Sequence, residues 1–311
     1  PVVGGLLSEF YDWPALFMMN IPLALLAWIS GFYCLPAAKE ETPGTFDWIG
    51  FILVTSGVGI LMLGLNQMSI ELLLLALICL GLFIRVELGR SAPLLSIRIF
   101  AIRSYWLSVV ISVVLFISMF QSFVVFPILM RTVLGYGPVW TGAALLITAL
   151  FTSLFANVSG KILDAQGPRA IVVFGLILSA VATLLLGNIS ATTSIWIIFS
   201  LMALRGIGFG FAYITVTTAG LNAIPENLVT QGSAMNNIAR RVFTSGAIIL
   251  ITLYFDSRTT QLLALSTAAD SSTALSHLTA INEIFIATGG LMLLAVPFAL
   301  LLPKPAQYAQ K

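Results

Sequence analysis

One arginine, Arg205, lies inside a long apolar stretch of this 311-residue sequence, at 195–224. It comes about ten residues into the stretch, which is about 15 Å along a helix that rises 1.5 Å per residue. A cation at that depth in hydrocarbon is costly, so it should face the protein interior and have a partner there. It therefore either contacts a substrate or influences a proton-binding carboxylate, or it forms a structural ion pair or extends to an interface.

Gln121 is a second polar residue within an apolar stretch, at 105–130. An amide in that position either lines a cavity or forms a hydrogen bond between helices. Phe120 and Phe123 stand beside it in the sequence. Aromatic and methionine surfaces adapt to apolar molecules of different shape, although such residues also serve in plain packing. We therefore take all three side chains as candidates for the wall of a binding cavity.

Phe209 lies one helical turn after Arg205, in the segment Gly206-Ile207-Gly208-Phe209-Gly210. No strand precedes this segment, so it is not a nucleotide-binding loop. Its glycines predict instead a flexible helix face that packs closely against its neighbours. Tyr213 follows a further turn along, on the face that carries Arg205 and Phe209. Phe209 and Tyr213 are therefore added to the candidate cavity.

The sequence offers no arrangement typical of catalysis. There is no recognisable nucleophile–base pair, no cluster that predicts a metal site and no phosphate-binding loop. His277 has no ligand partner nearby, and Cys34 and Cys79 lie in apolar stretches, where packing is their expected role. The 14 Lys and Arg form no basic stripe, so nucleic acid is not an expected partner. We therefore expect neither an enzyme nor a bound cofactor or metal.

Membrane helices are the elements that must position these candidates. Hydrophobic residues make up 59% of the chain and charged residues 8%, against about 25% charged in soluble domains. Apolar stretches of about 20 residues can cross about 30 Å of hydrocarbon, and the mean hydropathy is +1.06. Within lipid, helices satisfy every backbone group internally. We expect an all-α polytopic membrane protein with nine spans, at 15–35, 47–67, 69–88, 105–130, 139–163, 170–188, 195–224, 229–255 and 278–302.

Lys and Arg are distributed unequally between the two sides of these spans. Eleven, Arg240 among them, are assigned to one side and two, Arg131 and Arg258, to the other, with Arg205 counted for neither. Because short cytoplasmic loops are rich in Lys and Arg, the C-terminus is expected to be cytoplasmic. Residues 256–277, rich in Ser, Thr and Ala, are then expected to form an external loop, with the alternative that part of it continues the preceding helix. The expected cytoplasmic loops are 36–46, 89–104, 164–169 and 225–228.

Several short patterns of residues follow one another along the chain. The first is Pro1-Val2-Val3-Gly4-Gly5, in which small residues allow close helix approach and Pro bends a helix. The segment from Trp13 to Pro22 follows, with Phe17 and Asn20 between its ends, and then Asp47-Trp48-Ile49-Gly50. A stretch of small residues, Asn and Arg runs from Pro225 to Arg241.

A charged turn at 160–169 reads Gly160-Lys161-Ile162-Leu163-Asp164-Ala165-Gln166-Gly167-Pro168-Arg169. Gly160 allows close helix approach, and Asp164 and Arg169 can pair with each other or with a neighbouring helix end. Paired in this way, the turn would act as a latch between neighbouring helices. The alternative is an ordinary charged turn that follows the positive-inside rule.

Together these patterns resemble motifs of the EmrB/QacA-type drug/proton antiporters, a fourteen-spanner group of the major facilitator superfamily. Pro1, Gly4 and Gly5 resemble the end of the group's antiporter motif, at the outer end of its fifth helix. The segment from Trp13 to Pro22 resembles the start of the sixth helix, with Pro14 in place of the usual Arg. The latch residues resemble the second copy of the group's cytoplasmic loop, and they are Gly160, Asp164, Gly167 and Arg169.

The resemblance implies a major facilitator fold that is partial here, from the end of the fifth helix through the fourteenth. It extends over essentially all 311 residues. In this interpretation the chain is a C-terminal fragment. The implied segments are 1–35 as a remnant of the N-terminal half, 36–46 as a cytoplasmic loop, 47–88 as an inserted two-helix pair, 89–104 as a cytoplasmic connector, 105–304 as the C-terminal six-helix half and 305–311 as a cytoplasmic tail.

The resemblance also implies proton-coupled efflux of amphipathic drugs or toxic compounds by alternating access, in the inner (cytoplasmic) membrane. The implied partners are small amphipathic substrates, protons, the lipid bilayer and a periplasmic adaptor protein that touches 256–277. In the family the proton-coupling carboxylates lie largely in the N-terminal half, which agrees with the lack of a carboxylate at mid-span here. The alternatives are a fourteen-spanner transporter of a defined metabolite or siderophore, and a transport-inactive truncated membrane protein.

Overall fold

Helices make up the regular structure of the described part of the chain. The computed structural model describes residues 13–34, 47–90, 95–265 and 269–303, and within these ranges it contains no strand. The all-α prediction is therefore confirmed for these residues. The elements are α2 (Trp13–Met18), α3 (Asn20–Cys34), α4 (Trp48–Gln67), α5 (Ile70–Gly89), η1 (Ile97–Ala101), α6 (Arg103–Ile128), η2 (Leu129–Val133), α7 (Pro138–Gln166), α8 (Pro168–Leu186), α9 (Ile195–Leu221), η3 (Glu226–Leu228), α10 (Val229–Leu265) and α11 (Ala269–Leu300).

Eight of the described helical segments are long and apolar enough to cross a membrane. They are α4, α5, α6 continued by η2, α7, α8, α9, α10 with η3, and α11. Each coincides with one of the predicted spans. The chain is therefore a multi-pass membrane protein.

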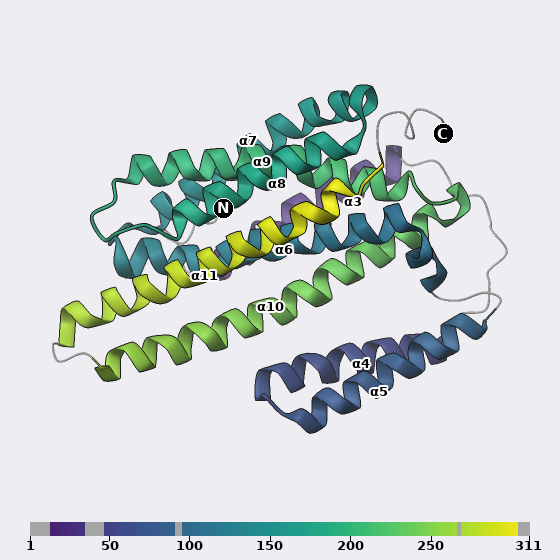
Figure 1. Ribbon diagram of the computed structural model, residues 1–311, viewed down its shortest axis with the longest axis horizontal. Helices are drawn as coiled ribbons and strands as arrows, with labels where there is room; N and C mark the ends of the chain where they lie inside the picture. Colours follow the sequence, from purple (N-terminus) through teal and green to yellow (C-terminus); the bar gives the residue numbers. More distant parts are fainter. Residues whose placement is uncertain (1–12, 35–46, 91–94, 266–268, 304–311) are drawn as a thin grey trace.

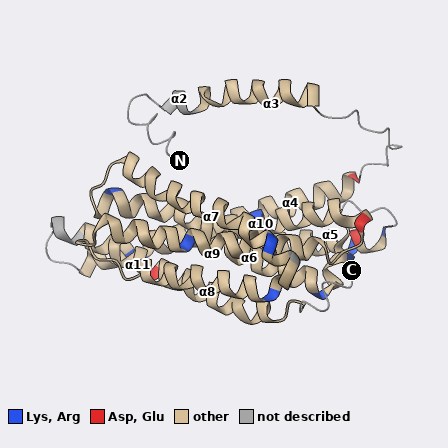
Figure 2. Cartoon of the chain, turned by 90° about the horizontal axis from the view of Figure 1, so that it is seen from above, with Lys and Arg blue, Asp and Glu red and all other residues tan. Residues whose placement is uncertain are grey.

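The first predicted span, 15–35, differs from the structure. It is divided near Met19 into α2 and α3, and α3 has 15 residues, about 22 Å at 1.5 Å per residue. Pro22 suits this new start, because a proline in the first turn of a helix removes no hydrogen bond that the helix needs. α3 contains no buried residue and lies apart from the bundle in Figure 2. Its Cys34 is exposed, so the expected packing role does not hold for that cysteine.

The external loop predicted at 256–277 is much shorter than expected, and the alternative that the preceding helix continues into it is confirmed. α10 continues to Leu265 and α11 begins at Ala269, so most of the segment is helical. The hydroxyls of Thr259 and Thr260 donate to backbone oxygens four residues earlier, at 2.5 and 2.8 Å, which satisfies these polar groups within a helix. In Figure 1, α10 and α11 run side by side as a long antiparallel pair.

α9 lies between α7 and α8, and its glycines set the distance to both. An ideal Cβ on Gly206 would lie 2.5 Å from the backbone oxygen of Thr148 on α7. One on Gly208 would lie 2.2 Å from Ser179 Oγ on α8. Side chains at these positions would clash, so close approach requires glycine there. The structure confirms the close packing predicted from the glycine segment.

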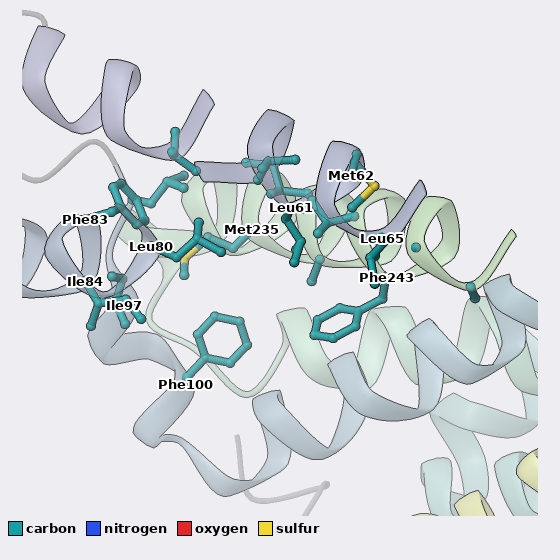
Figure 3. Close-up of a pocket in the computed structure, with 18 of the residues that line it drawn as sticks. Leu61, Met62, Leu65, Leu80, Phe83, Ile84, Ile97, Phe100, Met235 and Phe243 are labelled. Carbon is teal, nitrogen blue, oxygen red and sulfur yellow. The ribbon is translucent and has the colours of Figure 1, made fainter. Parts of the chain in front are cut away.

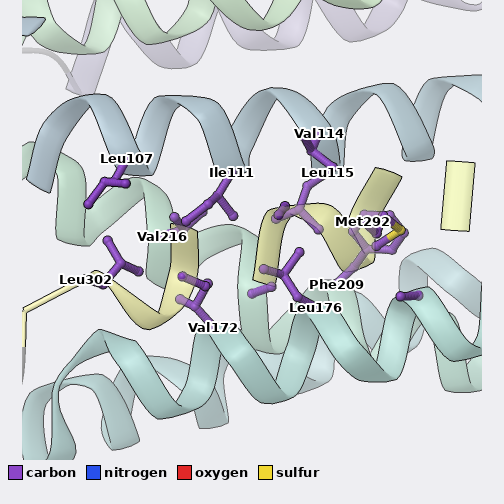
Figure 4. Close-up of a cluster of buried hydrophobic side chains, with 14 residues drawn as sticks. Leu107, Ile111, Val114, Leu115, Val172, Leu176, Phe209, Val216, Met292 and Leu302 are labelled. Carbon is purple, nitrogen blue, oxygen red and sulfur yellow. The ribbon is translucent and has the colours of Figure 1, made fainter. Parts of the chain in front are cut away.

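The main apolar core joins four helices (Figure 4). Leu107 and Ile111 come from α6, Val172 and Leu176 from α8, with further members from α9 and α11. All four of these named side chains are buried, and Phe209 of α9 belongs to the same cluster. This core holds α6 and α9 at a fixed relative position, which the site described below requires.

The helices α4 and α5 form a hairpin beside α10 (Figure 1). Asp47 caps α4 by accepting a hydrogen bond from the Gly50 amide at 2.8 Å, and it also pairs with Arg90 Nη1 at 2.8 Å. At the other end, Met68 adopts a left-handed φ of 52°, and Ser69 caps α5. The Asp47–Arg90 ion pair therefore joins the start of α4 to the end of α5.

Candidate functional site

A cavity of about 400 Å³ lies between α6, α7 and α9. Fifteen side chains of the described residues line it, and among these Arg205 alone has a formal charge. The apolar part of the wall is formed by Met, Phe, Leu, Ile and Ala side chains. The polar members are Ser122, Thr148, Thr152, Ser153, Asn157, Arg205 and Tyr213.

Arg205 is 1% exposed and is held by two serines of α6. Its Nη1 donates to Ser122 Oγ, and its Nη2 donates to the Ser118 backbone oxygen and, at 2.9 Å, to Ser118 Oγ. The Phe209 ring centroid lies 5.2 Å from its Cζ. No carboxylate pairs with Arg205 among the described residues. The structural ion pair and the extension to an interface, which were the two alternatives for Arg205, are therefore not seen among the described residues.

Two threonines of α7 fix the opposite wall of the cavity. Thr148 Oγ1 donates to the Met202 backbone oxygen at 3.0 Å, and Thr152 Oγ1 donates to that of Gly206 at 3.1 Å. Both acceptors belong to the turn of α9 that carries Arg205. These bonds hold the guanidinium between α6 and α7 without placing a charge beside it.

The predicted cavity residues divide into two groups. Arg205, Phe209, Tyr213 and Phe123 line the cavity. Phe120 is not among the lining residues, and its ring contacts those of Phe116 and Phe123, at centroid distances of 4.9 and 5.7 Å. The substrate role of each residue stays a prediction.

Gln121 is fully buried and lies outside the cavity wall. Its Oε1 is 3.5 Å from the neighbouring Ser122 Oγ, and its Nε2 has no hydrogen-bond partner among the described residues. Neither expected arrangement is therefore present there, since the amide neither lines this cavity nor bonds to another helix. Ser122 and Phe123 occupy the face toward the cavity instead, because each residue turns a helix by about 100°.

Arg240 is a site residue that the sequence interpretation missed. It was assigned to the cytoplasmic side with the loop cations, but the structure buries it within α10 at 6% exposure. Without Arg240 the cations still divide ten against two. Arg240 Nη1 donates to Tyr213 Oη at 2.6 Å, and its Cζ lies 4.8 Å from the Phe116 ring centroid. Arg240 lies about eleven residues into α10, and this depth was the signal that could have identified it.

The predicted latch turn joins α7 to α8. Gly167 has a φ of 71°, and Arg169 donates from Nε at 2.7 Å to the Leu302 backbone oxygen at the end of α11. Arg169 thus binds a neighbouring helix end, one of the two expected arrangements. A Cβ on Gly160 would meet no atom within 4 Å in the described structure, so the close approach predicted there is not present. The side chain of Asp164 lies outside the described residues, as do Pro1, Gly4 and Gly5 of the expected antiporter motif.

A second hollow, of about 650 Å³, separates the α4–α5 hairpin from α10 (Figure 3). We call it the apolar groove. Leu61 and Leu80 of the hairpin face Phe100 and Phe243 across it. All twenty of its lining residues are apolar or glycine. It can bury apolar surface, but it offers no side-chain hydrogen bond and no charge.

The arrangement around Arg205 is suited to binding rather than to metal chemistry. Within the described ranges, His, Cys, Asp and Glu do not gather in any group that could hold a metal ion. His277 has its Nδ1 3.4 Å from Thr132 Oγ1, where the two rings of Phe255 and His277 also meet. The cavity combines an apolar wall with a few directional donors, as ligand cavities commonly do.

The sequence profile of the Major Facilitator Superfamily matches residues 1–248, about four fifths of the chain. The chain belongs to the Major Facilitator Superfamily. Its all-α, multi-pass architecture is that of a partial major facilitator fold.

Relatives within this superfamily carry transport or resistance names. The lincomycin resistance protein LmrB of Listeria monocytogenes is 26% identical over 257 residues, 80% of this chain and 54% of that protein. The multidrug resistance protein B homolog of Mycobacterium tuberculosis is 24% identical over 78% of this chain and 47% of its own length. The riboflavin transporter RibZ of Clostridioides difficile is 21% identical over 83% and 58%. The chain spans about half the length of the curated relatives it matches.

Proposed function

We propose that this chain forms part of a drug/proton antiporter of the EmrB/QacA type that exports amphipathic compounds by alternating access. In this proposal the chain supplies the end of the fifth helix through the fourteenth helix of a fourteen-spanner protein. α4 and α5 would be the inserted pair, and α6 to α11 the C-terminal six-helix half. The protein lies in the inner membrane with its C-terminus in the cytoplasm.

The observation that carries the proposal is the cavity around Arg205. A transporter binds its substrate near the middle of the membrane, between helices that move relative to one another. Arg205 lies ten residues from one end of the 27-residue α9, so the cavity is at that depth. Phe123, Phe209 and Met202 give it an adaptable apolar wall. The resistance proteins among the relatives support drugs as the substrate class.

Transport of a defined metabolite is the second candidate. It is favoured by the likeness to RibZ, whose name gives riboflavin as its substrate. Riboflavin joins an apolar ring system to a polar chain, and such a molecule also suits a cavity with both kinds of wall. The two candidates differ in breadth, because a transporter of one solute would ignore most members of a drug panel.

Proton coupling and a periplasmic adaptor complete the proposal. The coupling carboxylate is expected among residues other than those lining the cavity. The adaptor contact, predicted for 256–277, would involve the ends of two helices rather than a loop. α10 has 37 residues, about 55 Å, so it extends well beyond about 30 Å of hydrocarbon.

Expression of the complete reading frame in an efflux-deficient bacterial host tests the proposal. The panel contains lincomycin, apolar dyes, cationic drugs, anionic amphipathic drugs and riboflavin. We expect reduced susceptibility to several unrelated compounds, and loss of this protection when a protonophore removes the proton gradient. Unchanged susceptibility to every drug, with normal expression, would contradict the drug proposal. Movement of riboflavin alone would favour the second candidate, and movement of nothing would favour an inactive membrane protein. Arg205→Ala should lose export, and the exposed Arg241→Ala serves as its control.

A further inference from the structure

The charge of Arg205 lacks a counter-charge in the described structure. The ion pairs there are Arg90–Asp47 and Arg258–Glu283, and neither involves Arg205. All three of its hydrogen bonds go to neutral oxygens of Ser118 and Ser122. A buried cation with only neutral acceptors is much less stable than one that also has an anion beside it.

Part of the donor capacity of this guanidinium is unused. Arginine has five N–H donors, and the serines account for three hydrogen bonds. Nε has no partner among the described residues, but it is itself buried and does not face the cavity. The remaining Nη1 hydrogen suits one oxygen of a carboxylate or sulfonate, because a hydrogen bond between two charged groups is shorter and stronger than one between neutral groups.

The second buried cation adds to the positive potential of the cavity. Arg240 donates to Tyr213 Oη at 2.6 Å, and Tyr213 lines the cavity. The other hydrogen-bond partner of Arg240 is the neutral Asn237 Oδ1, at 2.5 Å. The described residues of the wall include no Asp or Glu, so a cationic ligand would meet repulsion from Arg205 in a medium of low dielectric.

We propose that the cavity takes an amphipathic organic anion. Its carboxylate or sulfonate binds Arg205, and its aromatic body packs against Phe123, Phe209 and Met202. This inference rests on the proposed function and specifies the substrate class of the same cavity. It separates this protein from an exporter of lipophilic cations, which would need a carboxylate in the wall.

Binding of two dyes with opposite charge tests this inference directly. Fluorescein and rhodamine 123 share a xanthene ring system, and at neutral pH fluorescein is an anion and rhodamine 123 a cation. The complete protein is placed in nanodiscs of neutral lipid, and each Kd is measured by fluorescence anisotropy against empty nanodiscs. We expect tighter binding of fluorescein. Arg205→Gln should weaken fluorescein binding by about tenfold or more, and Arg205→Lys should retain part of it. The exposed Arg241→Gln should change neither Kd.

A ligand series keeps the inference testable if the Arg205 variants fail to fold. 2-Naphthoate, 2-naphthamide and 2-naphthylmethylamine share one ring system and differ in charge, and each competes with fluorescein on the unaltered protein. We expect naphthoate to compete best and the amine worst. Equal competition by all three, or tighter binding of rhodamine 123 than of fluorescein, would overturn the inference. An Arg205→Gln protein that folds and binds both dyes equally less well would also overturn it, because it would give the arginine a structural role only. These failures leave export of neutral or cationic drugs intact, so they are distinguishable from failure of the proposed function.

Discussion

The cavity around Arg205 is smaller than the apolar groove, but it offers a ligand more specific contacts. The groove is larger, about 650 Å³ against about 400 Å³, but its wall contains only apolar residues and glycine. The smaller cavity has a buried cation and hydroxyls in fixed positions. Apolar burial gives affinity with little preference for orientation, whereas a few fixed polar groups select which molecule binds and how. We therefore assign substrate recognition to the smaller cavity.

The two hollows also differ in how firmly their walls are held. α9 is fixed to α7 and α8 through glycine contacts and threonine hydrogen bonds. The wall of the groove that α4 and α5 provide is mostly half-buried, and only three residues in each of these two helices are buried. A fixed wall preserves the geometry of directional contacts. This contrast predicts that substitutions near Arg205 have large effects and that those in the hairpin have small ones.

The largest expected effect comes from Gly208→Val on α9. The new Cβ would lie 2.2 Å from Ser179 Oγ, so α8 and α9 would have to separate. Overpacking of this kind costs about 1–3 kcal/mol or more, and here it also displaces Arg205. Size-exclusion chromatography and thermal unfolding in detergent should show little folded protein. Gly59→Val is the matched control, because a Cβ on this α4 glycine meets no atom within 4 Å. Equal losses for the two variants would contradict the assigned difference in packing.

A smaller effect is expected from Tyr213→Phe. This change removes the oxygen that accepts from Arg240 at 2.6 Å and leaves the ring in place. Loss of a hydrogen bond to a buried charged group costs about 1–3 kcal/mol, so the unfolding midpoint in SDS should fall. Tyr136→Phe is the control, because the Tyr136 hydroxyl makes no hydrogen bond within the described residues. If both variants unfold at the same midpoint, Arg240 does not depend on the tyrosine.

Phe123 and Phe243 compare the two hollows most directly. Phe123 lines the cavity at 42% exposure, and Phe243 lines the groove at 61%. An aromatic contact contributes about 1 kcal/mol, so Phe123→Ala should weaken dye binding about fivefold. Phe243→Ala should leave the Kd within about twofold. A larger loss in Phe243→Ala would move substrate recognition to the groove and reverse the assignment made above.

The fold was largely predictable from the sequence, because the length of an apolar stretch is local information. The depth of Arg205 followed from the same counting. Its partners did not, since Ser118 and Ser122 lie more than eighty positions away and meet it only when α6 packs on α9. The rotation of a helix was equally hidden, and Gln121 therefore lies outside the cavity wall while Ser122 lines it.

Errors in the sequence interpretation had two physical sources. Arg240 and Arg241 were counted together on the cytoplasmic side, although Arg240 lies within the predicted span 229–255 and only Arg240 of the two is buried. The segment 256–277 was taken for a loop because of its Ser and Thr content. Ser and Thr content does not distinguish a loop from a helix when the hydroxyls donate to the backbone of their own helix, as those of Thr259 and Thr260 do.

The smallest expected effect concerns Arg258 and Glu283, which contrast with Arg205 because they form an ion pair. Two hydrogen bonds join them, at 2.9 and 2.7 Å, and about a third of each side chain is exposed. Water and salt screen such pairs, so Arg258→Gln and Glu283→Gln should each lower the Tm by less than about 2 °C. The coupling in a double-mutant cycle should shrink further in about 1 M salt, where the Debye length is about 3 Å. Binding of fluorescein should be unchanged in both variants, since neither residue lines the cavity. A Tm loss as large as that of Gly208→Val would show that the α10–α11 pair, rather than the contacts of α9, holds the bundle together. The firmly held part of the molecule would then be α10 and α11 instead of the helices around Arg205.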